Sequence, residues 1–195
     1  TIGGDEYPAR LIGTDPQTDL AVIKIDASDL PTAVFGDSNS LHVGDIAIAI
    51  GNPLGSLGGT VTTGIISALD REISIEDETM TLLQTDAAIN PGNSGGGLFD
   101  ANGNLIGIVN AKQSAAGIEG LGFAIPISDA IDILNDLVAN GTVTTRPALN
   151  VSLYDHTASS QDSQYPSGVY IVQIIDGGAA DQAGLKINDR IVSFD

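Results

Sequence analysis

The residue best suited to chemistry in this 195-residue sequence is Ser94, which stands in a run of small residues. Gly92, Asn93, Gly95 and Gly96 flank it, and an apolar segment follows directly. A nucleophilic hydroxyl must be exposed on a rigid scaffold, beside backbone N–H groups that can hold a developing oxyanion. Glycines permit the backbone angles that turn neighbouring N–H groups towards one small cavity. The pattern predicts a nucleophile turn, although a glycine-rich hairpin with an inert serine would have the same residues.

Several segments in addition resemble one protease family. INPGNSGG (89–96) is similar to the active-serine signature of the HtrA/DegP family of trypsin-like serine proteases. GTDPQTDLAVIKI (13–25) resembles the strand that carries the triad aspartate, and GLGFAIP (120–126) resembles the segment that closes the second barrel. GNPLG (51–55) and TVTTGIISAL (60–69) match the family between these points. The resemblance covers essentially the whole chain.

The resemblance implies a set of site residues. Ser94 would be the nucleophile, and Asp19 would be the triad acid that orients the imidazole and steadies the imidazolium. The backbone N–H groups of Gly92, Asn93 and Ser94 would form the oxyanion hole. Ile89 would be a wall of a specificity pocket that accepts small aliphatic side chains. Without a complete first barrel, we expect the 90–93 loop to be disordered or wrongly turned.

Two other carboxylates compete with Asp19 for the role of triad acid. From the residues alone, Asp15 and Asp19 could each cap a turn, because both stand near a proline and a threonine. The resemblance selects Asp19, which directly precedes the apolar LAVIKI segment. Asp15 is then interpreted as a turn residue, and Asp86 as structural.

A serine nucleophile needs a base, and the sequence has only two histidines, His42 and His156. Neither stands in the T-x-x-H-V context that the family uses, and His156 falls in a polar segment that reads as a loop. In the family the catalytic histidine precedes the aspartate by a few tens of residues. We therefore expect it before Thr1, so that this chain is a truncated fragment without useful peptidase activity of its own.

Composition excludes several functions. The formal net charge is −18 with only 7 basic residues, which argues against a nucleic-acid partner, because phosphate binding needs clustered Lys and Arg. There is no cysteine, so neither disulfides nor a thiolate metal site is expected, and we expect no cofactor. No apolar run approaches the roughly 20 residues that span a bilayer.

The elements that must position these residues are mostly strands. The predicted strands, rich in apolar and β-branched residues, cover 21–25, 45–50, 61–66, 105–109 and 168–172. Helical spacing predicts a helix over 128–140 with Ser128 as cap and a stop at Asn140-Gly141, and a short one over 179–185. Residues 70–78 are charged and predict an exposed loop. Many strands and few helices indicate an all-β barrel or sandwich followed by a smaller module.

The resemblance refines this fold to a trypsin-like antiparallel β-barrel followed by part of a PDZ domain. Residues 1–36 would be the last strands of the first barrel, and 37–126 the complete second barrel. Residues 127–145 would be a helix and linker, and 146–195 a partial PDZ domain. A PDZ domain binds peptide C-termini along a sheet edge, with a backbone loop for the carboxylate. That loop would lie near residues 148–151, where Asn150 replaces the usual glycine.

The favoured function is an ATP-independent serine endopeptidase of protein quality control outside the cytoplasm. It would cleave unfolded or misfolded polypeptides, and the full-length protein would be a homo-oligomer built from trimers. The alternatives are a non-catalytic peptide-binding or chaperone-like module, and a purely structural β-barrel. The presence of both Ser94 and Asp19 favours the enzyme.

Overall fold

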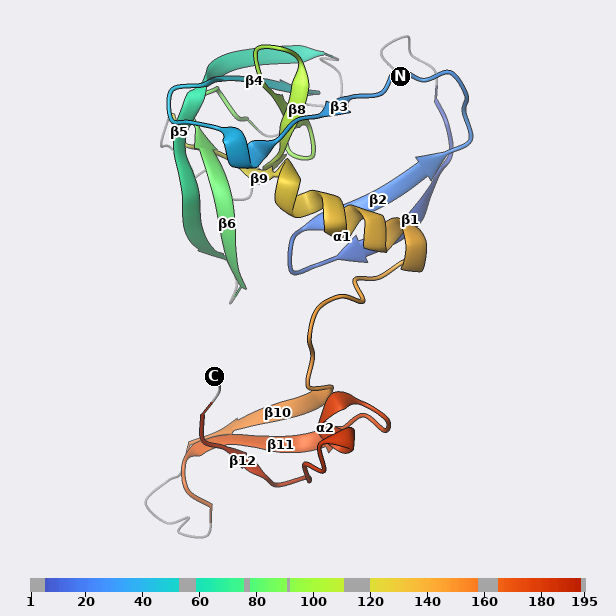
Figure 1. The fold of residues 1–195 in the computed structure, drawn as a ribbon, viewed down its shortest axis with the longest axis vertical. Coiled ribbons are helices and arrows are strands. Elements are labelled where there is room, and N and C mark those ends of the chain that lie inside the picture. Colours follow the sequence, from blue (N-terminus) through green and yellow to red (C-terminus); the bar gives the residue numbers. More distant parts are fainter. Residues whose placement is uncertain are drawn as a thin grey trace. The chain divides into compact units, whose positions relative to one another are not determined.

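The computed structural model describes residues 6–52, 59–75, 78–90, 92–110, 120–157 and 165–193. The chain divides into two compact units, Thr1–Thr144 and Thr145–Asp195 (Figure 1). Residues 53–58 and 111–119 lie outside the described residues, and with them most of the GNPLG match (51–55).

Six antiparallel strands close a barrel in the first unit, in the order β8-β7-β4-β5-β6-β9, with β8 paired to β9. A short strand, β3, adds to β8 in parallel. These strands are β3 (Val34–Phe35), β4 (Ile46–Gly51), β5 (Thr60–Ile75), β6 (Glu78–Thr85), β7 (Gly97–Phe99), β8 (Asn104–Asn110) and β9 (Gly122–Pro126). The barrel fold predicted from the sequence is confirmed.

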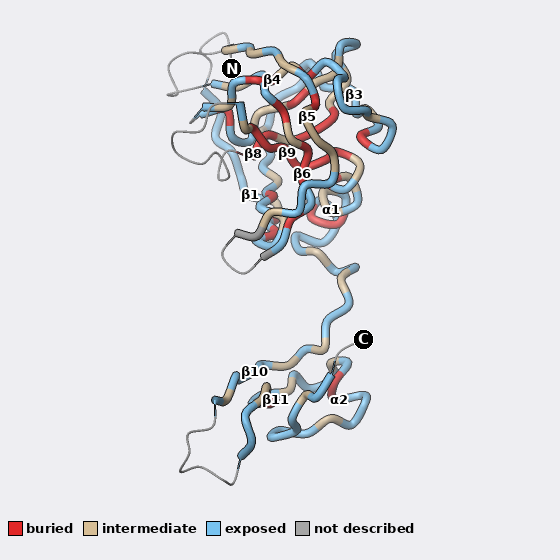
Figure 2. Tube along the Cα trace, turned by 90° about the vertical axis from the view of Figure 1, so that its left-hand side faces the viewer, coloured by how far each residue is buried: buried red, intermediate tan, exposed pale blue. Residues whose placement is uncertain are grey.

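The barrel interior is filled by small and medium-sized side chains. In β4, which reads IAIAIG, Ala47 and Ala49 are fully buried, whereas Ile46 and Ile50 point outward and are exposed. Ile66, Leu83, Leu98 and other apolar residues complete this cluster. Figure 2 shows the buried residues gathered in the barrel strands and in α1. The interior of a small closed barrel leaves room for little more than side chains, so alanines on one strand allow larger residues on the strands opposite.

The predicted loop over 70–78 is wrong, because β5 continues to Ile75 and β6 begins at Glu78. The register of the β5–β6 ladder shifts between Ala68 and Arg71, and Asp70 at this point has φ 52°. Such a bulge strengthens the twist of the strand. Residues 70–72 are exposed. The charges that suggested a loop are therefore explained by exposed positions within a strand.

Helix α1 (Ile127–Asn140) follows β9 directly and packs against β1, β2, β8 and β9. The predicted cap is wrong: the N-cap is Pro126, and Ser128 lies inside the first turn. The Ser128 hydroxyl instead accepts a hydrogen bond from the backbone N–H of Ser38, 3.0 Å away. The helix ends as predicted at Gly141, which has the left-handed φ of 76°. No helix in the described part of the chain is both long and apolar enough to cross a membrane.

A separate two-stranded sheet, β1 (Ala9–Asp15) and β2 (Leu20–Ile25), lies beside α1 (Figure 1). Leu20 anchors it by packing into a core cluster with residues of β6, β9 and α1. At Gly13, an added Cβ would lie 2.6 Å from the carbonyl oxygen of Gly141, so the strand rests directly on the end of the helix. The glycine is needed for this close approach.

The second unit contains a three-stranded antiparallel sheet in the order β10-β11-β12. Its elements are β10 (Val151–His156), β11 (Gly168–Ile174), α2 (Ala179–Gln182) and β12 (Arg190–Ile191). Asn150 has φ 59°, so it adopts the left-handed conformation for which glycine is usual. Asparagine tolerates this region better than most residues. The replacement of glycine by Asn150 is therefore compatible with a left-handed turn here.

Candidate active site

Ser94 is exposed on a turn that precedes β7 and is fastened to β8. The backbone N–H of Gly95 donates to the carbonyl oxygen of Val109 (2.9 Å), and the N–H of Val109 donates to the carbonyl oxygen of Gly96 (2.8 Å). Within the turn, the N–H of Gly96 donates to the carbonyl oxygen of Asn93 (2.9 Å). The serine therefore lies on a backbone held by the barrel.

The end of β4 passes directly behind this turn. An added Cβ at Gly51 would lie 2.4 Å from Oδ1 of Asn93, and one at Gly96 would lie 2.3 Å from the carbonyl oxygen of Ile50. The N–H of Asn52 donates to the carbonyl oxygen of Gly92 (3.2 Å). Two glycines thus let the two backbones touch.

Asp19 lies in the turn between β1 and β2, with the left-handed φ of 58°. Its N–H donates to the carbonyl oxygen of Pro16 (3.3 Å), and the hydroxyl of Thr18 donates to the Asp15 carboxylate. Asp15 is the last residue of β1 and is buried, with 5% of its surface exposed, and its carboxylate holds the following turn through the bond from Thr18. Aspartate adopts the left-handed region more readily than most residues, and Asp29 and Asp70 do so as well.

One strand end connects the aspartate turn to the serine turn. Nδ2 of Asn110, the last residue of β8, donates to Oδ2 of Asp19 at 3.5 Å. The residue before it, Val109, holds the serine turn through the two backbone bonds given above. Asp19 and Ser94 are therefore brought to the same end of β8. Reasoning from the sequence missed Asn110, because an asparagine at a strand end carries no local signal of a partner 91 positions away.

The predicted oxyanion hole is described in part, since residue 91 lies outside the described chain. Gly92 has φ 104°, a conformation that glycine favours. The N–H of Asn93 donates to the carbonyl oxygen of Asn90 (3.0 Å), so it closes a turn in this structure. The oxyanion hole formed by the N–H groups of Gly92, Asn93 and Ser94 stays a prediction.

The side chain of Asn93 is 1% exposed and supports the turn from inside. Its Nδ2 donates to the carbonyl oxygen of Ala88 (3.3 Å), whereas its buried Oδ1 has no hydrogen-bond partner. A buried carbonyl oxygen without a donor is costly, by about 1–3 kcal/mol. Asn93 therefore holds the turn in place at some cost in stability.

Ile89 and Asp86 stand on the segment that leads to Ser94. Ile89 is half-buried, and an added Cβ at Gly122 of β9 would lie 2.5 Å from its Cγ1. An isoleucine side chain thus fills the space above this glycine, and its role as the wall of a specificity pocket stays a prediction. Oδ1 of Asp86 accepts from the backbone N–H of Ile65 (2.7 Å), which is a structural role.

The two histidines lie in different units, and each has neighbours within its own unit. His42 lies on the exposed turn before β4, where its Nδ1 is 3.9 Å from Oδ2 of Asp45. His156 is the last residue of β10, not part of a loop as its sequence context suggested. Its ring contacts Tyr154 and Tyr170, and its buried Nε2 has no hydrogen-bond partner.

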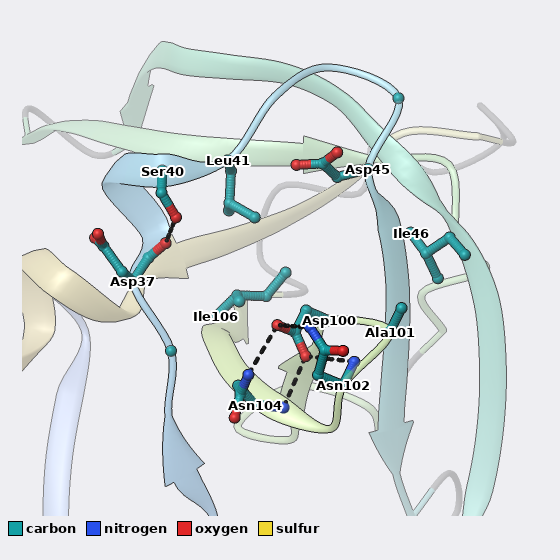
Figure 3. A pocket seen from close by; sticks show the side chains of 12 residues that line it. Asp37, Ser40, Leu41, Asp45, Ile46, Asp100, Ala101, Asn102, Asn104 and Ile106 are labelled. Carbon is teal, nitrogen blue, oxygen red and sulfur yellow. Dashed lines mark hydrogen bonds between the residues drawn. The ribbon is translucent and has the colours of Figure 1, made fainter.

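A separate hollow lies between the 36–46 segment and the turn from β7 to β8 (Figure 3). Three carboxylates line it, and each accepts hydrogen bonds from its own loop. Asp37 accepts from the N–H of Asn39, Asp45 from that of His42, and Asp100 from Asn102 and Asn104. These acids stabilise turns, and among the described residues no group of three or more His, Cys, Asp or Glu could hold a metal ion.

Comparisons with known proteins agree on one family. The family described as the trypsin-like peptidase domain matches residues 1–108. The serine protease Do-like HtrB of Bacillus subtilis (strain 168) is 44% identical over 207 residues, which cover 98% of this chain and 45% of that protein. A probable periplasmic serine endoprotease DegP-like of Chlamydia pneumoniae is 46% identical over 195 residues, with 98% and 40% covered.

Solved structures give the same answer. The structure of the HtrA-type protease AlgW with a decapeptide superposes with a TM-score of 0.72 at 43% identity, covering 98% of this chain and 59% of that one. The chain spans less than half the length of the two curated relatives named above. Because the family match covers more than half of the 195 residues and HtrA-type proteins match nearly all of them, the chain belongs to the trypsin-like peptidase family, among its HtrA/DegP members.

Proposed function

We propose that this chain carries the nucleophile and the acid of a serine endopeptidase site. The observation that supports this most is the end of β8, where Val109 bonds to the Ser94 turn and Asn110 bonds to Asp19. Two segments 75 positions apart in the sequence, at residues 19 and 94, are thereby tied to consecutive residues of one strand. An inert glycine hairpin has no need of this arrangement.

The chemistry follows from the roles of the three groups. The Ser94 hydroxyl attacks the scissile carbonyl while an imidazole takes its proton, and the resulting imidazolium protonates the leaving amine. Asp19 orients the imidazole and stabilises its positive charge. The N–H groups of Gly92, Asn93 and Ser94 are the proposed donors to the tetrahedral oxyanion. Water then releases the acyl group by the reverse sequence of proton transfers.

The base in this proposal does not come from the two histidines of the chain. His42 is exposed beside Asp45, and His156 is packed among tyrosine rings. We propose an imidazole from outside this chain, so the chain alone should have little peptidase activity. Loss of one triad member can lower kcat by about 10⁶.

Added imidazole allows the serine to be tested directly. We expect a fluorophosphonate probe to label the chain slowly in buffer and faster with increasing imidazole, with the label on Ser94. Ser94→Ala should abolish labelling, and Asp19→Asn should abolish the response to imidazole. Equal labelling of Ser94→Ala and the wild type would contradict a nucleophilic role for Ser94. Casein cleavage by the chain in plain buffer, lost in Ser94→Ala, would contradict an external base.

Substrates and setting are proposed from the relatives. The solved AlgW structure contains a decapeptide, and DegP-like relatives are named as probable periplasmic endoproteases. We propose that unfolded polypeptides are cleaved outside the cytoplasm, after small aliphatic residues that fit beside Ile89. Peptide phosphonates that differ only in the side chain next to the reactive group test this preference. In the wild type we expect labelling with small aliphatic side chains, and Ile89→Gly should extend labelling to larger ones.

The second unit is proposed to be part of a peptide-binding PDZ domain. This proposal is supported by the left-handed backbone of Asn150, which lies in the predicted carboxylate loop. The carbonyl oxygen of Asn150 accepts a hydrogen bond from the N–H of Ile175 (3.0 Å). Assembly into trimer-based oligomers is likewise proposed for the full-length protein. Titration with peptides that have a free apolar C-terminus tests binding, and the same peptides with an amidated C-terminus are the control.

A further inference from the structure

The segment that leads to Ser94 leaves the sheet where β6 ends, at Thr85, but it stays beside β5. The hydroxyl of Thr85 donates to the carbonyl oxygen of Ile65 (2.8 Å), and Oδ1 of Asp86 accepts from the N–H of Ile65 (2.7 Å). An added Cβ at Gly64 would overlap Asp86, so the segment lies directly against the strand. Side chains thus extend the attachment of this segment to β5.

Thr62, on the same strand, holds the next part of the segment. Its hydroxyl donates to the carbonyl oxygen of Ala88 at 2.9 Å. The same oxygen accepts from Nδ2 of Asn93 at 3.3 Å, and Asn93 directly precedes Ser94. A backbone carbonyl oxygen has two lone pairs. The two donors therefore use its whole acceptor capacity and fix the plane of the peptide group.

Two parts of the proposed site depend on this one peptide group. Its nitrogen belongs to Ile89, the proposed wall of the specificity pocket. Its oxygen supports Asn93, whose buried side chain holds the turn that presents Ser94. Thr62 itself is paired with the fully buried Ala49 in the β4–β5 ladder, so the barrel holds it in place. A rotation of the peptide plane would move the pocket wall and the serine turn together.

We propose that Thr62 is a positioning residue for the serine turn and the pocket wall, a role that rests on the proposed function of Ser94 and Ile89. The Thr62 hydroxyl fixes the Ala88 carbonyl relative to β5, and Asn93 is fixed in turn by that carbonyl. Without the hydroxyl, the oxygen keeps only the longer of its two hydrogen bonds, and the peptide plane is less firmly held. Thr62 acts through these neighbours and not on the substrate.

The neighbouring residue on β5 provides a matched control. Thr63 is exposed, and it lies opposite Ile48 in the β4–β5 ladder. Successive residues of a strand point to opposite faces, so Thr63 points away from Ala88. Thr62→Val and Thr63→Val each replace a hydroxyl with a methyl group. Thr62→Ser keeps the hydroxyl and should restore whatever depends on this hydrogen bond.

NMR on the whole chain tests the contact independently of activity. Thr62→Val should shift the side-chain amide resonances of Asn93, because the two donors share one acceptor. Thr63→Val should leave these resonances in place. Asn93 resonances that stay unchanged in Thr62→Val would overturn the proposal. Wild-type resonances in the rest of the barrel verify that each variant is folded.

Labelling of Ser94 in the presence of imidazole tests the role in the site. Thr62→Val should lower the rate with a fluorophosphonate by about two- to tenfold, the effect of one hydrogen bond. It should also change the ratio of rates between peptide phosphonates with small and with large side chains, because the Ile89 wall moves as well. Thr62→Ser and Thr63→Val should retain the wild-type rate and ratio.

Two results would overturn the role of Thr62 alone. A merely structural role predicts a less stable Thr62→Val with an unchanged rate and ratio. Labelling of Thr62→Ser as slow as that of Thr62→Val would mean that the hydroxyl is not the group responsible. Absence of imidazole-dependent labelling in the wild type would instead contradict the proposed function, and the role of Thr62 with it.

Discussion

Two glycines, Gly51 and Gly96, are as important to the site as the residues that have side chains there. At Gly51 and Gly96 the end of β4 touches the turn that carries Ser94, at distances that no Cβ allows. Asn93 lies beside them, and its buried Oδ1 has no hydrogen-bond partner, which lowers stability. The nucleophile is thus held by backbone contact from behind, and its hydroxyl is left exposed in front.

Gly51→Ala should therefore displace the serine turn. The added methyl group would lie 2.4 Å from Oδ1 and 2.7 Å from Cα of Asn93, so the backbone of the turn would have to shift. We expect the free energy of unfolding to fall by about 1–3 kcal/mol, together with the Ser94 labelling rate. Gly103→Asn is the control, since its φ of 80° suits asparagine and nothing lies within 4 Å of an added Cβ. Urea unfolding of both variants gives the comparison, and equal stabilities would contradict the contact.

Asp100 contributes a pH-dependent part of stability. Desolvation raises the pKa of Asp100. Hydrogen bonds from the backbone and side chain of Asn104 and from Asn102 lower it by more, so the pKa lies below its ordinary value. A lowered folded-state pKa gives stability that is present above the unfolded value, about 3.9, and is lost as the pH falls through the folded value. Asn104→Leu should raise the Asp100 pKa, as measured by carboxyl ¹³C NMR titration. A pKa that stays unchanged would show that Asn104 has little influence.

At the scale of elements, the C-terminal end of α1 holds the last residues of the first unit by hydrogen bonds. Asp136, 8% exposed, accepts hydrogen bonds from the side chain of Asn140 and from both the N–H and the hydroxyl of Thr144. The Thr144 backbone is therefore held against the helix, and β1 rests through Gly13 on Gly141 just before it. The hairpin that carries Asp19 depends on this helix end.

Asp136→Ala should loosen this junction. Hydrogen bonds to a buried charged group are each worth about 1.5–3 kcal/mol, so we expect a loss of at least that size in the free energy of unfolding. Amide exchange at Thr144 should accelerate more than exchange in the barrel. Asp132→Ala, on the exposed face of the same helix, should change little. Slow exchange at Thr144 in both variants would mean that the carboxylate does not hold the chain.

Much of the fold was predictable because the signals are local. Apolar and β-branched residues identified the strands around 45–50 and 105–109, and Asn140-Gly141 marked the end of α1. The charged half of β5 was missed because pairing with β6 overrides the weak propensity of residues 70–72. Ser128 was misread since its hydroxyl bonds to Ser38, 90 positions away.

In the candidate site, too, some residues are predictable from local sequence and others are not. The glycine turn around Ser94 and the aspartate before LAVIKI are visible as motifs. Asn110 and the contact of Gly51 with Asn93 depend on which strands become neighbours, and no local pattern gives that information.

At the scale of the whole molecule, charge is the dominant property. With 25 acidic and 7 basic residues, the folded chain brings many carboxylates together, and their repulsion opposes compaction. Salt screens such repulsion. We expect the Tm to rise between 0.05 and 1 M NaCl by about 2–4 °C, the shift that corresponds to roughly 1 kcal/mol for a chain of this size. KCl should act like NaCl, because screening depends on ionic strength. A Tm that falls with salt would contradict repulsion as the main effect.

The attachment of both turns to consecutive residues of β8 limits how this protein can change during evolution. Neighbouring residues on a strand point to opposite faces, so one residue inserted between Leu105 and Val109 would put Val109 at the position from which the Asn110 side chain now reaches Asp19. The turn at 100–103, in contrast, can absorb insertions without moving either one, provided that the β7–β8 register is kept. Length variation among homologous chains should therefore be common at that turn and absent from the strand that follows it.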